Sequence, residues 1–193
     1  MVVVLYEDQR GERGDFGFHR FVCQYVLDQK PGLAKSVYQL EKQVVRSIVC
    51  KGNGNVLAKC KRDLKKLANQ FRKVIAVYDQ DKLNELLNLK GIQCRRALLE
   101  GLIEPCDPKA ALDIVFVNPN LESVIKTIQD SGNASSIDSG HFIKALGKDL
   151  NARDSLFIQC ANLPRDVRDK LFAALPDINR LVAKIAEFSQ SMN

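Results

Sequence analysis

Four short runs of apolar, mostly β-branched residues, separated by stretches long enough for helices, constrain the fold of this chain most. The runs cover residues 2–7, 44–50, 73–78 and 111–117. Runs of this length without polar alternation are typical of strands that are buried on both faces. Strands that alternate with helices usually form a parallel sheet. The sequence therefore predicts an α/β fold, a mostly parallel sheet with helices on both faces.

Apolar residues at helical spacing predict helices between the strands and throughout the C-terminal part. The expected helices cover residues 18–29, 56–71, 83–89, 121–128, 141–150, 153–161, 165–174 and 176–190. Residues 92–99 fit either a helix or a strand, and residues 129–140, rich in Ser, Gly, Asn and Asp, predict a loop. We therefore expect an α/β domain over residues 1–128, a loop over 129–140 and a helical C-terminal cap over 141–193.

Composition excludes some classes of protein and leaves others open. No apolar run approaches the roughly 18–20 residues that a membrane helix needs, so we expect no membrane association. The net charge of +6 permits a polyanionic partner but does not require one. The six cysteines form no Cys-x-x-Cys pair and the chain has two histidines, His19 and His141. Zinc ligands usually cluster more tightly, which favours reduced cysteines that pack as small apolar residues in a cytoplasmic protein.

Three carboxylates stand where predicted strands end. Glu7 follows the first apolar run, and Asp79 and Asp81 follow Val-Ile-Ala-Val-Tyr at 74–78. The carboxyl ends of parallel strands meet at one edge of a sheet, and convergent carboxylates repel one another unless a cation lies among them. Hard oxygen ligands suit Mg²⁺ or Mn²⁺. The other interpretation is that the aspartates form turns or cap a helix.

The order of these motifs resembles the TOPRIM domain of topoisomerases, primases and OLD-family nucleases. The matching pieces are the strand that ends in Glu7, the turn Lys51-Gly52-Asn53-Gly54 that leads into a basic helix, and the strand that ends in Asp79-Gln80-Asp81. The glycine turn is most similar to the OLD branch and to small stand-alone TOPRIM-like proteins. The resemblance spans about residues 1–125 and implies a Rossmann-like arrangement of the sheet.

The resemblance also implies roles for individual residues. Glu7 would act as a general acid or base, or as a metal ligand, and Asp79 and Asp81 would bind Mg²⁺. Glu122 stands where the family often has a further acid, and it would complete a second metal position. Its other interpretation is a favourable acid in the first turn of a helix. The chain departs from the family in its acid-rich segment 8–17, and it has no room for a separate domain with a topoisomerase tyrosine, which argues against strand passage.

Basic residues gather around the predicted helix 56–71. Lys51, Lys59, Arg62 and Lys66 are the candidates to bind a nucleic-acid backbone near the metal. The alternative is an ordinary solvated helix face. The turn at Gly52 likewise fits either a phosphate cradle at a helix N-terminus or a plain tight turn.

Together these patterns predict Mg²⁺- or Mn²⁺-dependent, nuclease-like phosphodiester chemistry on nucleic acid, in the setting of phage or mobile-element defence that the resemblance to OLD-like proteins suggests. The alternative is a non-catalytic TOPRIM-like subunit that binds a partner protein, such as an ATPase, in a defence or repair complex. A third possibility is a receiver-like or nucleotide-binding module in which the acids bind Mg²⁺ for phosphoryl transfer.

Overall fold

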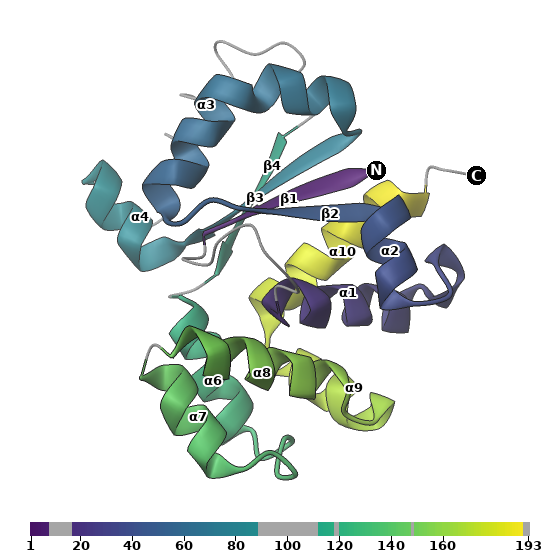
Figure 1. Ribbon diagram of the computed structural model, residues 1–193, viewed down its shortest axis with the longest axis vertical. Coiled ribbons are helices and arrows are strands. Elements are labelled where there is room, and N and C mark those ends of the chain that lie inside the picture. Colours follow the sequence, from purple (N-terminus) through teal and green to yellow (C-terminus); the bar gives the residue numbers. More distant parts are fainter. Residues whose placement is uncertain (8–16, 89–111, 118–119, 148, 191–193) are drawn as a thin grey trace. The chain divides into compact units, whose positions relative to one another are not determined.

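The computed structural model describes residues 1–7, 17–88, 112–117, 120–147 and 149–190 (Figure 1). The strands are β1 (Val2–Tyr6), β2 (Val45–Val49), β3 (Lys73–Asp79) and β4 (Leu112–Val117). The helices up to the last strand are α1 (Gly17–Gln29), the 3₁₀ turn η1 (Pro31–Leu33), α2 (Val37–Gln43), α3 (Asn53–Gln70) and α4 (Gln80–Leu87). The remaining helices are α6 (Leu121–Asp130), α7 (Ser139–Leu146), α8 (Leu150–Ala161), α9 (Arg165–Ala173) and α10 (Pro176–Gln190).

The four strands form one parallel sheet in the order β2-β1-β3-β4. The central pair is in register from Val2 opposite Lys73 to Tyr6 opposite Val77. The bounds of each strand differ from those of a predicted apolar run by at most one residue, and the C-terminal part is helical. The predicted α/β class with a parallel sheet and a helical C-terminal portion is therefore confirmed.

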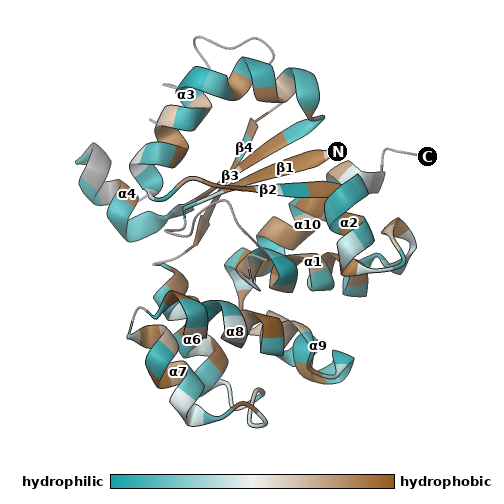
Figure 2. Ribbon diagram, viewed as in Figure 1, coloured by the Kyte–Doolittle hydropathy of each residue, from teal (hydrophilic) through white to brown (hydrophobic). Residues whose placement is uncertain are grey.

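Every residue of β3 is buried. Because successive side chains of a strand point to opposite faces, this burial means that both faces of the sheet are covered at β3. On one face, α3 packs through residues at helical spacing against β1, β3 and β4, with Leu83 of α4 beside them. The α3 residues in this core are Val56, Cys60, Leu64 and Leu67. Figure 2 shows the strands as mainly apolar and α3 as mixed, as expected for a helix with one buried face.

The described residues group into two compact units. The strand unit contains residues 1–7, 45–88, 112–117 and 120, and the helical unit contains 17–44, 121–147 and 149–190. Residues 17–44 therefore belong with the C-terminal helices, although they lie between β1 and β2 in the sequence. The linear boundaries at residues 128 and 140 stay a prediction, because this grouping follows contacts and not chain order.

The helical unit has its own core, in which α1 packs against α8 and α10. Aromatic rings join α1 to α8 and to α9: the Phe18 and Phe157 centroids are 5.0 Å apart, and the Phe21 and Phe172 centroids are 5.8 Å apart. A bidentate ion pair between Asp28 and Arg168 ties α1 to α9 with N–O distances of 2.6 Å. Within the described residues, no helix is long and apolar enough to cross a membrane.

Three helices, α3, α4 and α8, begin three residues earlier than the sequence pattern predicts, and the first two bear on the carboxylates. Helix α3 begins at Asn53 because Lys51 and Gly52, with φ of 59° and 120°, complete a tight turn straight after β2. Helix α4 begins at Gln80, immediately after β3. Asp79 is therefore the last strand residue, whereas Asp81 lies in the first turn of a helix. The undecided segment 92–99 lies outside the described residues, as does most of the predicted loop 8–17.

Candidate functional site

Glu7 and Asp79 both lie at the carboxyl edge of the sheet. Tyr6 of β1 pairs with Val77 of β3, so Glu7 follows β1 at the level of Tyr78, and Asp79 ends β3 one residue further along. Side-chain exposure is 7% for Glu7 and 5% for Asp79. The sequence prediction that these two acids meet at one edge of the sheet agrees with this placement.

The two carboxylates are in hydrogen-bonding contact, and Lys82 lies between them. The Lys82 ammonium nitrogen is 3.4 Å from Glu7 Oε1 and 3.4 Å from Asp79 Oδ2. These two oxygens are therefore no further apart than twice 3.4 Å. A single cation with oxygen ligands at roughly 2.0–2.6 Å is within reach of both groups after small side-chain adjustments.

Burial raises the pKa of the Asp79 carboxyl well above its ordinary value. The hydrogen bond to Glu7 and its negative charge raise the pKa further, and Lys82 opposes them by lowering it. Two buried carboxylates in contact resist losing their last proton, because the proton reduces the repulsion between them. A bound cation would reduce the same repulsion. Perturbed carboxyl groups of this kind concentrate at functional sites.

Asn53, the first residue after the β2–α3 turn, holds the main chain of Asp79 through two hydrogen bonds. Its side-chain NH₂ donates to the Asp79 carbonyl at 2.8 Å, and its side-chain oxygen accepts from the Asp79 N–H at 3.2 Å. Asn53 is itself buried, as the first residue of α3. The glycine turn thus positions Asp79 by presenting Asn53, and its geometry is that of a tight turn with Lys51 and Gly52 at positive φ.

Asp81 has partners of its own. One carboxylate oxygen accepts from the Lys82 N–H at 2.7 Å, and the other accepts from the Asn120 side chain at 2.8 Å. Asp81 thus lies inside the first turn of α4 and is not at the capping position that the sequence left open for the aspartates. Asn120 follows β4, so Asp81 links the carboxyl ends of β3 and β4 and does not have both its oxygens available to a cation in this arrangement.

Glu122 belongs to the helical unit, where it lies in the first turn of α6. Its carboxylate accepts a 2.6 Å bond from Arg153 of α8. The interpretation of Glu122 as a first-turn acid on a helix therefore agrees with the structure, and its role as a second metal ligand stays a prediction.

The four candidate phosphate-binding residues lie in α3 or just before it, and two of them form ion pairs. Lys59 and Arg62 both contact Asp63, each at 3.0 Å. These two cations hold the pKa of the Asp63 carboxyl well below its usual range. Lys51 and Lys66 are exposed. The solvent-facing lysines therefore fit a nucleic-acid backbone better than the two residues that pair with Asp63.

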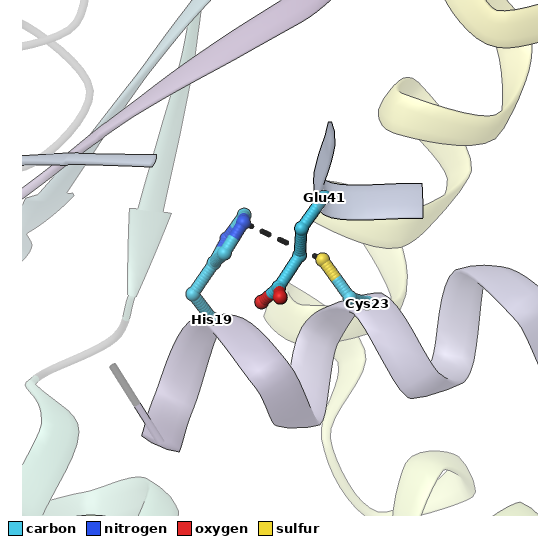
Figure 3. A group of neighbouring side chains, drawn as sticks. All are labelled: His19, Cys23 and Glu41. Carbon is cyan, nitrogen blue, oxygen red and sulfur yellow. Dashed lines mark hydrogen bonds between the residues drawn. The ribbon is translucent and has the colours of Figure 1, made fainter. Parts of the chain in front are cut away.

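The structure also brings together three side chains that the sequence did not connect. His19 and Cys23 of α1 and Glu41 of α2 offer ligand atoms that all lie within 4.8 Å of one another (Figure 3). The signal in the sequence was a His and a Cys four residues apart on a predicted helix, which places them on one face. Glu41 carried no such signal, because it depends on how α2 packs against α1.

The chain was compared with protein-family models, with curated proteins and with solved structures, and none of them matched. The resemblance to TOPRIM domains therefore rests on the motifs that end in Glu7, Gly54 and Asp81.

Proposed function

We propose that Glu7 and Asp79 hold a divalent cation, Mg²⁺ or Mn²⁺, for nuclease-like cleavage of phosphodiester bonds in nucleic acid. The observation that carries this proposal is the contact between two buried carboxylates at the carboxyl edge of a parallel sheet. This edge is where open α/β sheets bind their ligands. The resemblance to OLD-like TOPRIM proteins supports the same chemistry and suggests a setting in phage or mobile-element defence.

A bound cation would compensate the repulsion between the Glu7 and Asp79 carboxylates, which Lys82 compensates only in part. Two like charges about 4 Å apart repel by about 4 kcal/mol at an effective dielectric constant of about 20. Mg²⁺ is usually bound through one or two protein carboxylates, with water and substrate phosphate in its other positions. Glu7 and Asp79 supply such a pair, so Asp81 can keep its bonds to Asn120 and the main chain.

The residues around the pair suit a phosphodiester substrate. When bound, the cation would neutralise negative charge on the phosphate and lower the pKa of a bound water. Glu7 would accept the proton of the attacking water, whose oxygen would bond to phosphorus as the ester bond breaks and the leaving oxygen takes a proton from solvent. Lys82 reaches this edge with a side chain that is 47% exposed and can move onto a phosphate oxygen. Lys51 and Lys66 are exposed and can contact the backbone further away.

The position of Lys82 also favours a second candidate function. An ammonium 3.4 Å from both acids partly compensates their charge without a metal. A TOPRIM-like subunit that has lost catalysis and binds a partner protein would keep such an arrangement. This candidate predicts a stable pair that binds no divalent cation.

A cleavage assay separates the two candidates. Plasmid DNA and structured RNA are incubated with the wild type, Glu7→Gln and Asp79→Asn in Mg²⁺ and in Mn²⁺. We expect metal-dependent cleavage by the wild type and a loss of at least about 100-fold in both variants, as for the removal of a catalytic electrostatic group. The control is Asp166→Asn, an exposed acid on α9. Cleavage that persists in Asp79→Asn would overturn the proposal, and folded wild type that neither cleaves nor binds the ion supports the non-catalytic candidate.

A further inference from the structure

We propose that His19, Cys23 and Glu41 form a zinc site in the helical unit, separate from the Glu7–Asp79 pair. Neither the sequence pattern nor the proposed nuclease chemistry assigns a role to these three side chains. They differ from the Glu7–Asp79 pair in donor type, in unit and in the metal that they suit.

Two packed helices bring the three ligands together. His19 and Cys23 are four residues apart on α1, so their side chains share one face of the helix. Helix α2 packs against α1 and carries Glu41. Ser36 fixes the start of α2 by accepting a bond from the Gln39 N–H at 3.2 Å. Figure 3 shows the Glu41 carboxylate directed between the His19 ring and the Cys23 sulfur.

The distances match those of a zinc centre. His19 Nε2 and Cys23 Sγ are 3.5 Å apart. For a tetrahedral zinc ion with bonds of about 2.05 Å to nitrogen and about 2.3 Å to sulfur, these atoms would be separated by about 3.6 Å. The Glu41 oxygen lies within 4.8 Å of both. Glu41 is only half-buried, so a small rotation of its side chain suffices to complete the set.

The donor set selects zinc over the hard ions expected at the other site. One imidazole nitrogen, one thiolate sulfur and one carboxylate oxygen are all established zinc ligands, whereas Mg²⁺ avoids sulfur. A neutral imidazole, a thiolate and a carboxylate carry a combined charge of −2, which neutralises Zn²⁺ in a buried place. Three protein ligands leave the fourth tetrahedral position for water or another small ligand, the arrangement of catalytic zinc centres.

Zinc would have to displace one proton from these side chains. Burial lowers the pKa of His19 to about 3, so at neutral pH the imidazole is uncharged and has a nitrogen lone pair to give. Burial and the nearby Glu41 charge raise the pKa of the Cys23 thiol, so without metal the thiol keeps its proton. Zinc binding therefore releases one proton from Cys23 to solvent as the zinc–sulfur bond forms.

The contact between His19 and Cys23 has a second explanation, a simple hydrogen bond in a core without metal. Cobalt substitution distinguishes the two. The full chain is stripped of metal with a chelator and titrated with Co²⁺, whose complexes with thiolate give a sulfur-to-cobalt charge-transfer band. We expect this band to saturate at one Co²⁺ per chain and to disappear when one equivalent of Zn²⁺ is added.

Matched variants test which residues bind. Cys23→Ser should abolish the charge-transfer band and weaken Zn²⁺ binding by at least about 100-fold, more than the loss of a residue that only orients a ligand. The control is Cys160→Ser, since Cys160 is equally buried in α8 of the same unit and should keep the band. Glu41→Gln, at a half-buried position, covers the case in which Cys23→Ser does not fold, and should weaken binding at least tenfold. Asp79→Asn should leave the band unchanged.

Two results would overturn the zinc site. One is a wild type that gives no thiolate band with stoichiometric Co²⁺. The other is a band that persists in folded Cys23→Ser, because the thiolate would then come from another cysteine.

Discussion

Replacing Asp79 with Asn should make the protein more stable at neutral and alkaline pH. The amide is nearly the same size as the carboxyl and can donate a hydrogen bond to Glu7, so the contact survives without the like charge. The raised pKa of Asp79 means that the folded state holds a proton there that the unfolded chain releases at about pH 4. The wild type therefore loses stability as the pH rises from about 4 through the raised folded pKa, and the variant does not.

The size of the gain follows from the contacts of Asp79. Between the unfolded pKa of about 4 and the folded pKa of about 9, each pH unit costs about 1.4 kcal/mol of stability, which amounts to about 5 kcal/mol at pH 8. The attraction to Lys82 that the variant loses is worth about 0–1 kcal/mol, because the lysine side chain is 47% exposed. We expect a net gain of about 4 kcal/mol at pH 8, or a rise in Tm of about 8–16 °C for a chain of this size.

Urea unfolding followed by circular dichroism at pH 5 and pH 8 measures this effect. The difference between Asp79→Asn and wild type should be about 1 kcal/mol at pH 5 and several times larger at pH 8. Asp81→Asn is the matched control, because Asp81 bonds to Asn120 and to the Lys82 main chain, and it should not stabilise the fold. A variant that is less stable than wild type at pH 8, or a difference independent of pH, would refute the reasoning.

Three further substitutions test the surrounding structure by urea unfolding. Asn53→Ala removes both hydrogen bonds to the Asp79 main chain and should lower the free energy of unfolding by about 2 kcal/mol; an unchanged unfolding midpoint would mean that these bonds do not stabilise the fold. Asp28→Asn leaves the buried Arg168 guanidinium without its bidentate partner and should cost about 3–5 kcal/mol, whereas a loss below about 1 kcal/mol would show the pair to be solvated. Gly17→Ala places a methyl group against the main chain of α8 and should cost about 1–3 kcal/mol; wild-type stability would mean that the helices separate easily.

The strands could be predicted from the sequence because burial on both faces leaves a plain signature. The run Val74–Tyr78 has no polar residue, and the structure buries all of β3. An acid that follows such a run must lie at the end of the strand, and this is why the sequence alone indicates Glu7 and Asp79. Because β1 and β3 are neighbours in a parallel sheet, both acids lie at the same edge.

The rest of the site depends on tertiary contacts that leave no periodic signal. Helix α4 starts one residue after Asp79, so Asp81 turns toward Asn120, a partner from a distant strand end. Lys82 comes to both acids only because of that early helix start. The meeting of Glu41 with His19 depends on the packing of α2 against α1, and no spacing in the sequence encodes it.

The most direct test of the central proposal is a measurement of Mn²⁺ binding by electron paramagnetic resonance of the free ion. The wild type should bind one Mn²⁺ that Mg²⁺ displaces, and Glu7→Gln and Asp79→Asn should each weaken this binding by at least about 100-fold, since each removes one of two protein ligands. Cys23→Ser should bind Mn²⁺ as the wild type does, because hard cations avoid sulfur. Equal Mn²⁺ affinity in the wild type and in folded Asp79→Asn would contradict the account.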